Sequence, residues 1–508
     1  MSAAKRVLSG SVAAWVGIGI TFAQRLALVP VILSVWSSSQ FGIYLVVTAY
    51  LGLVRVLGRS FEGVTVFECL KTGRENTSRL KVLICSGSVV NLFVEIIAGF
   101  FVIILLICGQ RFYPMPINVK GLILILAVNI MIRTLFEYPS AIIAGALCCF
   151  GYQPKYAWLG LIAQCVRPLG VLAAILCGLN VLGVVLVELL LPSIVGFIIF
   201  WWIIRRWAKT NQIWGWLTDF KKAFRLWLYS LLNFGKDLSE MFRQQGIQLI
   251  LAPMSGVAGL TAFATMRTGA NVALQGLGTI TSPLMPELMR FLNQRDQVRT
   301  EAAFATVWLL LMAILAPGVI FLQLCIRPLF ELWTRGKVVF DPALFALMSL
   351  GVLVYAMAQP AMAVVQGNNL LKPQLVVSSI AGILVILVMC LLVPRIGILG
   401  SGLALLAGEV VAAVGYLRVA SRWLKSNGLS WPKSAYASVI LSVVVSGCTM
   451  LGIAWLPQWH FVCFLIGFAI LIFSLKTYLR HLPDVARQRL LLLVSKLPGA
   501  RRLGRLCP

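Results

Sequence analysis

The chain of 508 residues is 60% hydrophobic and only 12% charged, and its mean hydropathy is +0.94. A soluble globular domain carries about 25% charged residues, so this composition excludes an ordinary soluble protein. Hydrophobic runs of about 20 residues recur along the whole chain, and each is long enough to cross a hydrocarbon core of about 30 Å. The sequence therefore predicts an all-α polytopic membrane protein.

The hydrophobic runs predict about 14 transmembrane helices, because each run is followed by a polar or basic segment that can serve as a loop. The first span contains the stretch ITFAQRLALVPVIL, with Arg25 at its centre. In chain order the predicted spans are 11–36, 41–67, 82–108, 121–146, 157–177, 181–204, 230–253, 257–284, 303–326, 342–365, 374–393, 398–417, 436–456 and 459–475.

The formal net charge of +27 follows the predicted loops rather than forming one basic patch, which argues against nucleic acid as a partner. With the amino terminus inside, the inner segments hold 29 Lys and Arg residues and the outer loops hold 6. Cytoplasmic loops of membrane proteins carry this excess, so both termini are predicted to be cytoplasmic. The basic tail 481–508 is expected to adhere to anionic membrane lipids.

The chemistry-bearing residues show no catalytic or metal-ligating pattern. The twelve cysteines are scattered without a CxxC, and the only two histidines are His460 and His481. Small hydrophobic packing explains cysteines of this kind. Gly-rich phosphate loops and catalytic triads are also absent from the sequence. We therefore predict no catalytic residue, no metal, no organic cofactor and no enzymatic activity.

The chain repeats itself at an offset of about 217–221 residues. Gly42 and Gly52 correspond to Gly259 and Gly269, and Leu182-Gly183 corresponds to Leu399-Gly400. Pro139 of YPSAIIAG likewise corresponds to Pro360 of QPAMAVVQG. Each half contains an even number of spans, six, so the repeat predicts two lobes of the same orientation, as found in some transporters.

The repeat defines the predicted organisation of the chain. Two six-helix lobes are joined by a cytoplasmic linker and followed by an additional transmembrane hairpin and a basic tail. The predicted limits are 1–204 for the N-terminal lobe, 205–229 for the linker, 230–420 for the C-terminal lobe, 421–480 for the hairpin and 481–508 for the tail.

Fifteen charged residues fall inside the predicted spans, where lipid offers them no partner. The eight cations are Arg25, Arg55, Arg59, Arg133, Arg167, Lys236, Arg243 and Arg267, and the seven acids are Glu62, Glu95, Glu137, Glu188, Asp237, Glu240 and Glu409. Arg133 and Glu137 are four residues apart on one helix and are predicted to pair. Lys236 and Glu240 could pair in the same way.

Arg55 and Arg59 are also four residues apart, so two like charges share one helix face, which is destabilising by itself. Glu62 can neutralise only one of them. Cations at membrane depth must face water or an anion, and tertiary pairing with distant carboxylates is the alternative. The polar run from Lys236 to Gln248 in the seventh span also indicates a cavity lining, and Pro30 and Pro253 are expected to break helices near it.

A cationic cavity between two lobes predicts an anionic substrate, and arginine suits phosphate because its planar fork donates paired hydrogen bonds. The predicted substrate-binding residues are Arg25, Arg55, Arg59, Arg267, Arg167 and Arg243.

The region RLALVPVILSVWSSSQFGIYLVVTAYLGLVRVLG, with Pro30 and the junction Phe41-Gly42-Ile43-Tyr44, resembles the polysaccharide-transport branch of the MOP (multidrug/oligosaccharidyl-lipid/polysaccharide) exporter superfamily, the Wzx-type flippases. The Gly145 and Gly367 turns and the Leu-Gly starts of spans 6 and 12 fit the same pattern. Late in span 2 that family usually has an acidic or small residue with glycine, where this chain has Arg55, Gly58 and Arg59.

The resemblance implies two six-helix bundles around a central chamber lined by spans 1, 2, 7 and 8. It implies a polyprenyl-pyrophosphate-linked oligosaccharide as substrate, flipped across the bacterial inner membrane by alternating access, for O-antigen, capsule or exopolysaccharide synthesis. Polysaccharide polymerase and glycosyltransferases would be its partners. Related flippases are coupled to ion gradients, so Glu62, Asp237 and Glu240 are the candidates for H⁺ or Na⁺ coupling.

Three other functions remain open from the sequence. A drug or organic-cation exporter of the same superfamily would require carboxylates without competing arginines. A flippase for the cell-wall precursor lipid II would have a similar architecture and charge. A non-transporting scaffold would tolerate charge-neutral substitutions in its spans.

Overall fold

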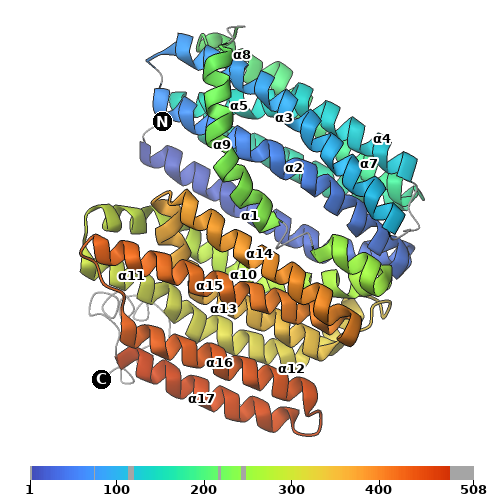
Figure 1. Cartoon of the computed structure of the whole chain (residues 1–508), viewed down its shortest axis with the longest axis vertical. Coiled ribbons are helices and arrows are strands. Elements are labelled where there is room, and N and C mark those ends of the chain that lie inside the picture. The colour runs from blue at the N-terminus through green and yellow to red at the C-terminus, as the bar shows by residue number, and fades with distance from the viewer. Residues whose placement is uncertain (1–2, 74, 113–118, 216–218, 242–246, 481–508) are drawn as a thin grey trace. The chain divides into compact units, whose positions relative to one another are not determined.

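The computed structural model describes residues 3–73, 75–112, 119–215, 219–241 and 247–480, and these ranges are helical and contain no strand (Figure 1). In chain order the helical elements are α1 (Ala3–Val35), α2 (Ser38–Thr72), α3 (Thr77–Phe112), α4 (Val119–Ile132), η1 (Arg133–Glu137), α5 (Tyr138–Leu147), η2 (Cys148–Phe150), α6 (Gln153–Leu176), α7 (Val181–Ile199), η3 (Phe200–Ile204), α8 (Arg205–Thr210), α9 (Phe220–Met241), α10 (Ile247–Asn293), α11 (Gln297–Leu310), η5 (Leu311–Leu315), α12 (Ala316–Trp333), α13 (Pro342–Gly367), α14 (Leu371–Ile396), α15 (Ile398–Ser426), α16 (Lys433–Trp455) and α17 (His460–Arg480).

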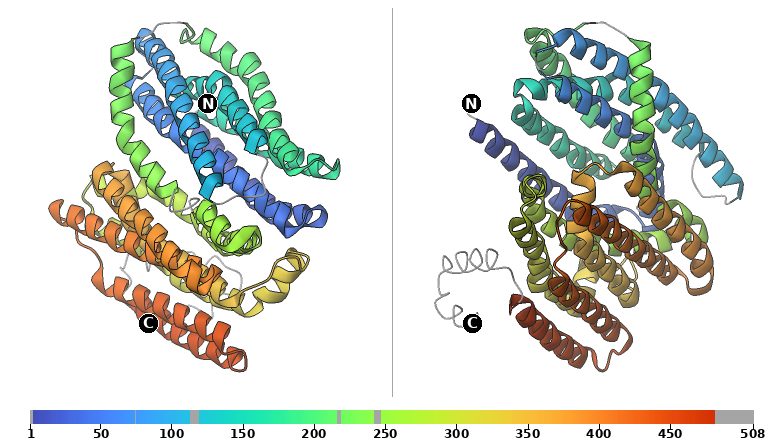
Figure 2. Two further views of the ribbon diagram at one scale, coloured as in Figure 1. Left: turned by 45° about the vertical axis from the view of Figure 1, so that its right-hand side comes forward. Right: turned by 60° about the vertical axis from the view of Figure 1, so that its left-hand side comes forward.

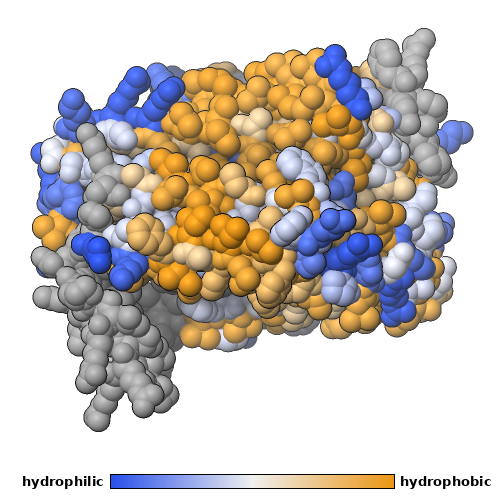
Figure 3. Space-filling model, turned by 90° about the horizontal axis from the view of Figure 1, so that it is seen from below, coloured by the Kyte–Doolittle hydropathy of each residue, from blue (hydrophilic) through white to orange (hydrophobic). Residues whose placement is uncertain are grey.

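Twelve described helical stretches are long and hydrophobic enough to cross a membrane, and they match twelve of the fourteen predicted spans. Of the other two spans, the second corresponds to α2, which has 35 residues but carries several charges. The surface agrees with a lipid environment, because hydrophobic side chains form a broad band on the face in Figure 3 while hydrophilic ones gather toward its two ends. The predicted fold, an all-α multi-pass membrane protein with about 14 transmembrane helices, is confirmed.

The seventh predicted span, 230–253, is described only in part. Its first residues belong to α9, which is described as far as Met241, and its last residues belong to α10, which is described from Ile247. Lys236, Asp237 and Glu240 lie in the last described turns of α9. One continuous span over 230–253 stays a prediction.

The helices form two compact units, residues 1–261 and residues 262–508. In the first unit α2 packs against α3, α5 and α9, while α6 packs between α1 and α7. Residues 220–241 therefore belong to the first unit by their contacts, although the repeat assigned them to the linker and the second lobe. The lobe limits drawn from the repeat stay a prediction.

The first turns of α10 pack against the start of α2, where the two backbones approach closely. A Cβ atom built on Gly42 would lie 2.2 Å from Cγ1 of Val257, so only glycine fits there. The Thr261 hydroxyl donates a hydrogen bond to the carbonyl oxygen of Ser38 at 2.8 Å. These contacts hold the beginning of α10 in the first unit.

The expected helix breaks at two prolines are not found. Pro30 lies inside the continuous helix α1, and Pro253 lies inside the first turns of α10. The change of direction in α10 occurs instead at Gly256, with φ 72° and ψ 169°, a conformation that glycine adopts at no steric cost. A proline removes one backbone hydrogen bond, which a long helix can tolerate, whereas a residue with positive φ cannot continue the helix.

The second unit is built around α13. Within this span 78% of the residues are buried, the highest share among the candidate spans, and α13 packs against α15 and α16. Helices α16 and α17 form the predicted hairpin and contact α12. The buried Tyr478 hydroxyl donates to the carbonyl oxygen of Ala305 at 2.7 Å, which attaches the hairpin to α11.

Candidate functional site

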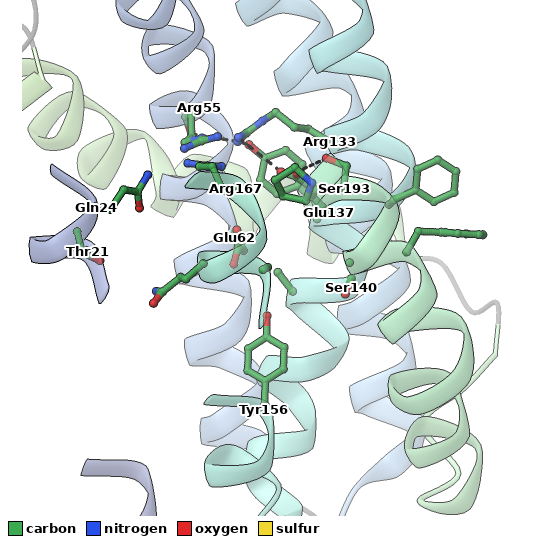
Figure 4. Close-up of a pocket in the computed structure, with 18 residues that line it drawn as sticks. Thr21, Gln24, Arg55, Glu62, Arg133, Glu137, Ser140, Tyr156, Arg167 and Ser193 are labelled. Atoms are coloured by element: carbon green, nitrogen blue, oxygen red, sulfur yellow. Dashed lines mark hydrogen bonds and ion pairs between the residues drawn. The ribbon is translucent and has the colours of Figure 1, made fainter. Parts of the chain in front are cut away.

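A cavity of about 600 Å³ lies within the first unit, and five charged side chains line it (Figure 4). This volume falls in the range of about 300–1,000 Å³ that is typical of small-ligand sites. The charged residues are Arg55 from α2, Arg133 and Glu137 from η1, Arg167 from α6 and Glu62 from α2. The neutral polar residues are Thr21, Gln24, Tyr138, Ser140, Tyr156, Gln164 and Ser193.

Arg133 is the most buried charge of this site, with 4% of its side chain exposed, and two carboxylates face it. Its Nη2 lies 3.6 Å from Oε1 of the fully buried Glu95 on α3, and its Nη1 lies 3.8 Å from Oε2 of Glu137. The predicted pairing of Arg133 with Glu137 is confirmed, but Glu95 is a second partner that helix spacing did not indicate. Nη2 also donates to the carbonyl oxygen of Arg55 at 3.3 Å.

Tyr138 completes this buried group because η1 is a π-helical turn. The Tyr138 amide donates to the carbonyl oxygen of Arg133, five residues earlier. Five residues of an α-helix rotate by about 500°, which would place the two side chains about 140° apart. The wider π turn brings them to one face, where Arg133 donates to the Tyr138 hydroxyl and this hydroxyl donates to Glu95. Such π turns are frequent at functional sites.

Arg55 and Arg167 face the same part of the cavity, and Figure 4 shows their guanidinium groups close to Arg133. Among the described residues no ion pair within 4.0 Å joins either of them to a carboxylate. The charges within electrostatic range of Arg55 are Arg167, Arg133, Glu137 and Glu188. Three guanidinium groups therefore share one site, and two of them have no direct carboxylate partner in the described part of the chain.

Glu188 on α7 provides a further negative charge near these arginines. It accepts a hydrogen bond from the hydroxyl of the half-buried Tyr44 on α2, over 2.8 Å. This bond ties α7 to α2. Among the described residues, the donor to the Glu188 carboxylate is therefore a neutral hydroxyl and not an arginine.

The structure brings three of the nine predicted site residues into this cavity, namely Arg55, Arg167 and Glu62. Arg243 lies outside the described residues. The side chains of Arg25, on α1, and Arg59, on α2, are also outside the described part of the structure. Their participation in the site stays a prediction.

Arg267 lies on α10 in the second unit, where only 8% of it is exposed and its guanidinium lies 5.9 Å from the ring centre of Phe263. Asp237 and Glu240 lie in the last turns of α9 and are half-buried. Asp237 forms an ion pair of 3.3 Å with its neighbour Lys236. Neither acid lines the described cavity, so ion coupling through them stays a prediction.

Sequence reasoning gave no role to Glu95 or Tyr138. Glu95 was one of seven acids in the spans, and it is separated from Arg133 by 38 positions and a predicted loop. The only local signal was the unusual density of Arg133, Glu137 and Tyr138 in a predicted span, but a π turn cannot be read from that pattern.

No protein-family model and no curated protein sequence matches this chain. Among solved structures, the outward-facing conformation of a multidrug resistance MATE family transporter of the MOP superfamily has 14% sequence identity and a TM-score of 0.55, covering 84% of this chain and 96% of that one. The inward-facing conformation of such a transporter has 13% identity and a TM-score of 0.58, covering 80% and 95%. A MATE structure in complex with MaL6 has 11% identity and a TM-score of 0.58, covering 84% and 97%.

These likenesses establish the fold, which is that of MATE transporters of the MOP superfamily. At identities of 11–14% they do not carry over a substrate. Membership of the MOP superfamily and of its polysaccharide-transport branch stays a prediction from the sequence resemblance.

Proposed function

We propose that this protein is a flippase that moves a polyprenyl-pyrophosphate-linked oligosaccharide across the bacterial inner membrane. The observation that carries the proposal is the grouping of Arg55, Arg133 and Arg167 around one cavity in a unit that spans the membrane. Guanidinium groups bind phosphate oxygens through paired, charge-assisted hydrogen bonds, and they do so most strongly where water is scarce.

The three arginines have different roles in this proposal. Arg133 holds Glu95 and Glu137 and therefore organises the wall of the cavity. Arg55 and Arg167 have no carboxylate within ion-pair distance among the described residues, so they are the groups that bind the pyrophosphate. The bound lipid would then be translocated across the membrane by alternating access, without a covalent step.

The acids of the cavity support a second candidate, an exporter of organic cations. Glu62 and Glu137 line the same cavity, and the similar solved structures include multidrug resistance transporters. Carboxylates bind cationic drugs, but each cation would also meet three arginines here. A lipid II flippase would use the same pyrophosphate site and would differ in the sugar that it accepts.

Direct binding to the purified full-length protein in neutral lipid nanodiscs separates an anionic substrate from a cationic one. We expect geranylgeranyl pyrophosphate to bind and tetraphenylphosphonium not to compete with it. Arg55→Ala and Arg167→Ala should each weaken pyrophosphate binding roughly tenfold to a hundredfold, the worth of a hydrogen bond to a charged group. Lysine at either position should restore part of the affinity, because it keeps the charge but loses the fork.

The matched control is Arg327→Ala, which removes an exposed arginine that pairs with Glu331 at 3.1 Å. It should bind the pyrophosphate like the unaltered protein. Wild-type affinity in both Arg55→Ala and Arg167→Ala, at equal amounts of folded protein, would refute the anion site. Displacement of the pyrophosphate by tetraphenylphosphonium would favour the organic-cation exporter.

The remaining parts of the proposal concern coupling and context. Glu62, which lies in the cavity, is the first candidate for H⁺ or Na⁺ coupling, and Asp237 and Glu240 follow it. Both termini would be cytoplasmic, and a polysaccharide polymerase and glycosyltransferases would act on the same lipid-linked substrate. Export of surface polysaccharide by Glu62→Gln, compared with the unaltered protein at equal expression, tests the coupling role directly.

A further inference from the structure

Helix α9 crosses α2 and α3 instead of running along them, as Figure 1 and the right-hand view of Figure 2 show. Its first half carries three separate kinds of side chain around the helix. The face toward α2 and α3 consists of Ala223, Leu226 and Ser230, which are 1%, 7% and 3% exposed. At about 100° per residue these three side chains span an arc of about 60°, and this sector is packed against protein.

The second sector is hydrophobic and exposed. Phe220, Phe224, Leu228 and Leu231 follow one another at spacings of four, four and three residues, so they form a single stripe. At about 100° per residue the stripe covers an arc of about 80°, adjacent to the packed face. No described residue of the first unit covers this stripe, since these side chains are 40–67% exposed.

The third sector is cationic. Lys221, Lys222 and Arg225 are exposed and occupy the next arc of about 100° around the helix. A helix that faced only acyl chains would not carry three cations within one and a half turns. A helix that faced only water would not expose two phenylalanines and two leucines beside them. The two sectors fit the boundary between acyl chains and lipid headgroups.

The segment before α9 fixes the helix at one end of the first unit. The Asp219 amide donates to the hydroxyl of Ser86 at 2.8 Å, and the Cys85 thiol donates to the carbonyl oxygen of Gly215 at 2.8 Å. The Asp219 carboxylate accepts from the Lys222 amide at 3.1 Å and so caps the first turn of α9. The position of α9 is therefore set by the protein before any lipid binds.

An aromatic group next to this segment has the composition of a membrane interface. Arg205 lies over the rings of Trp201, at 4.0 Å, and Trp214, at 5.4 Å, and the neighbouring Trp202 is 71% exposed. Tryptophan is enriched where the headgroups begin. Gly215, which bonds Cys85, directly follows Trp214, so the start of α9 lies beside this group.

We propose that the first half of α9 is an interfacial helix that binds anionic phospholipid headgroups through Lys221, Lys222 and Arg225, with its hydrophobic stripe in the acyl region. Each cation near an anionic surface contributes attraction that disappears in a neutral bilayer. The binding is independent of the cavity and of the substrate proposed above. Under the predicted topology the leaflet is the cytoplasmic one.

Hydrogen–deuterium exchange of the full-length protein in nanodiscs tests this surface. We expect residues 220–231 to exchange roughly tenfold more slowly in discs of phosphatidylcholine with phosphatidylglycerol than in discs of phosphatidylcholine alone. The triple variant Lys221→Gln, Lys222→Gln, Arg225→Gln should lose that difference. Added salt should reduce it in the unaltered protein, since salt screens exposed charges.

The matched control neutralises three exposed cations elsewhere, with Arg418→Gln, Arg422→Gln and Lys425→Gln on α15. This variant removes the same net charge and should keep the lipid-dependent protection of residues 220–231. Equal exchange in the two kinds of disc would overturn the proposal, as would equal loss of protection in both triple variants. Protection of residues 220–231 that appears only after a soluble protein is added would show that this surface binds a protein partner. That result would also overturn the proposal. If the α9 variant folds poorly, the salt dependence of the unaltered protein still decides.

Discussion

At the scale of single residues, Arg133 shows how a cation is kept inside a membrane protein. Its Nη2 lies near Glu95 and its Nη1 lies near Glu137, and it donates a hydrogen bond to the Tyr138 hydroxyl, which in turn donates to Glu95. A buried ion pair of this kind adds little net stability, but removal of one partner leaves the other charge buried and unpaired. The main role of Arg133 is therefore to neutralise the carboxylates of Glu95 and Glu137.

We predict that Arg133→Met lowers the free energy of unfolding by about 3–5 kcal/mol, because the buried carboxylate of Glu95 then loses the cation that lies 3.6 Å from it. Adding Glu95→Met should recover most of this loss, since two hydrophobic side chains can replace a buried pair at little cost. Thermal unfolding in detergent measures both effects. A double variant as unstable as the single one would show that the pair contributes more than charge neutralisation.

Asn91 is a second residue-scale test, because it is fully buried on α3 and neither atom of its side-chain amide has a hydrogen-bond partner among the described residues. An unsatisfied buried polar group costs about 1–3 kcal/mol. Asn91→Leu, which is similar in size, should raise the unfolding midpoint. Glu95 lies one turn further along the same helix and is left unchanged. A lower midpoint in the leucine variant would instead indicate that Asn91 holds a bound water or ion.

At the scale of elements, two glycines decide how α10 begins. Gly256 turns the helix with a positive φ, and Gly42 allows α2 to approach Val257. The prolines that the sequence suggested as breaks do not perform this role. Helix α10 can therefore pack its first turns with the first unit and continue into the second after one local change of backbone direction.

Gly256→Ala and Gly42→Ala should both destabilise the protein, the first by about 1–2 kcal/mol because alanine disfavours a positive φ. The second should cost more than Gly269→Ala, because a Cβ on Gly269 would meet only the Phe345 ring at an ordinary 3.6 Å. Unfolding midpoints of the three variants give the order. Equal unfolding midpoints for the three variants would mean that the close contact between α2 and α10 does not contribute to stability.

The stability of the first turn of α9 is expected to depend on the cap formed by the Asp219 carboxylate. The hydrogen bond from the Lys222 side chain and that from its amide hold the pKa of Asp219 below its usual value. Its stabilising effect is present above the unfolded pKa of about 3.9 and is lost as the pH falls through the lower native value. In the unaltered protein the protection of the amides of residues 220–224 against exchange, relative to an unstructured chain, should therefore fall below about pH 4. Asp219→Asn should remove this pH dependence of the protection.

At the scale of the whole molecule, topology is the most general prediction. Reporter fusions after Lys209 and Lys425 should give a cytoplasmic signal, and fusions after Lys337 should give a periplasmic one, because the inner segments carry most of the cations. A periplasmic signal at Lys209 would reverse the orientation and move the α9 surface to the outer leaflet.

The sequence by itself determined the class of protein, the order and approximate number of its membrane-spanning helices, and the set of charges that needed an explanation. Hydropathy, helix length and loop charge are properties of short stretches, so they can be read without knowing what each stretch touches. The pairing of Arg133 with Glu137 was accessible for the same reason, because both residues lie on one helical segment.

Only the tertiary structure decided which charges meet. Glu95 reaches Arg133 because α3 packs against η1, and Arg167 joins Arg55 because α6 and α2 line one cavity. Side-chain contacts between helices depend on crossing and rotation, which neighbouring residues do not encode. The π turn at η1 and the turn at Gly256 were hidden for a related reason, since each is a local exception to α-helical geometry that packing stabilises.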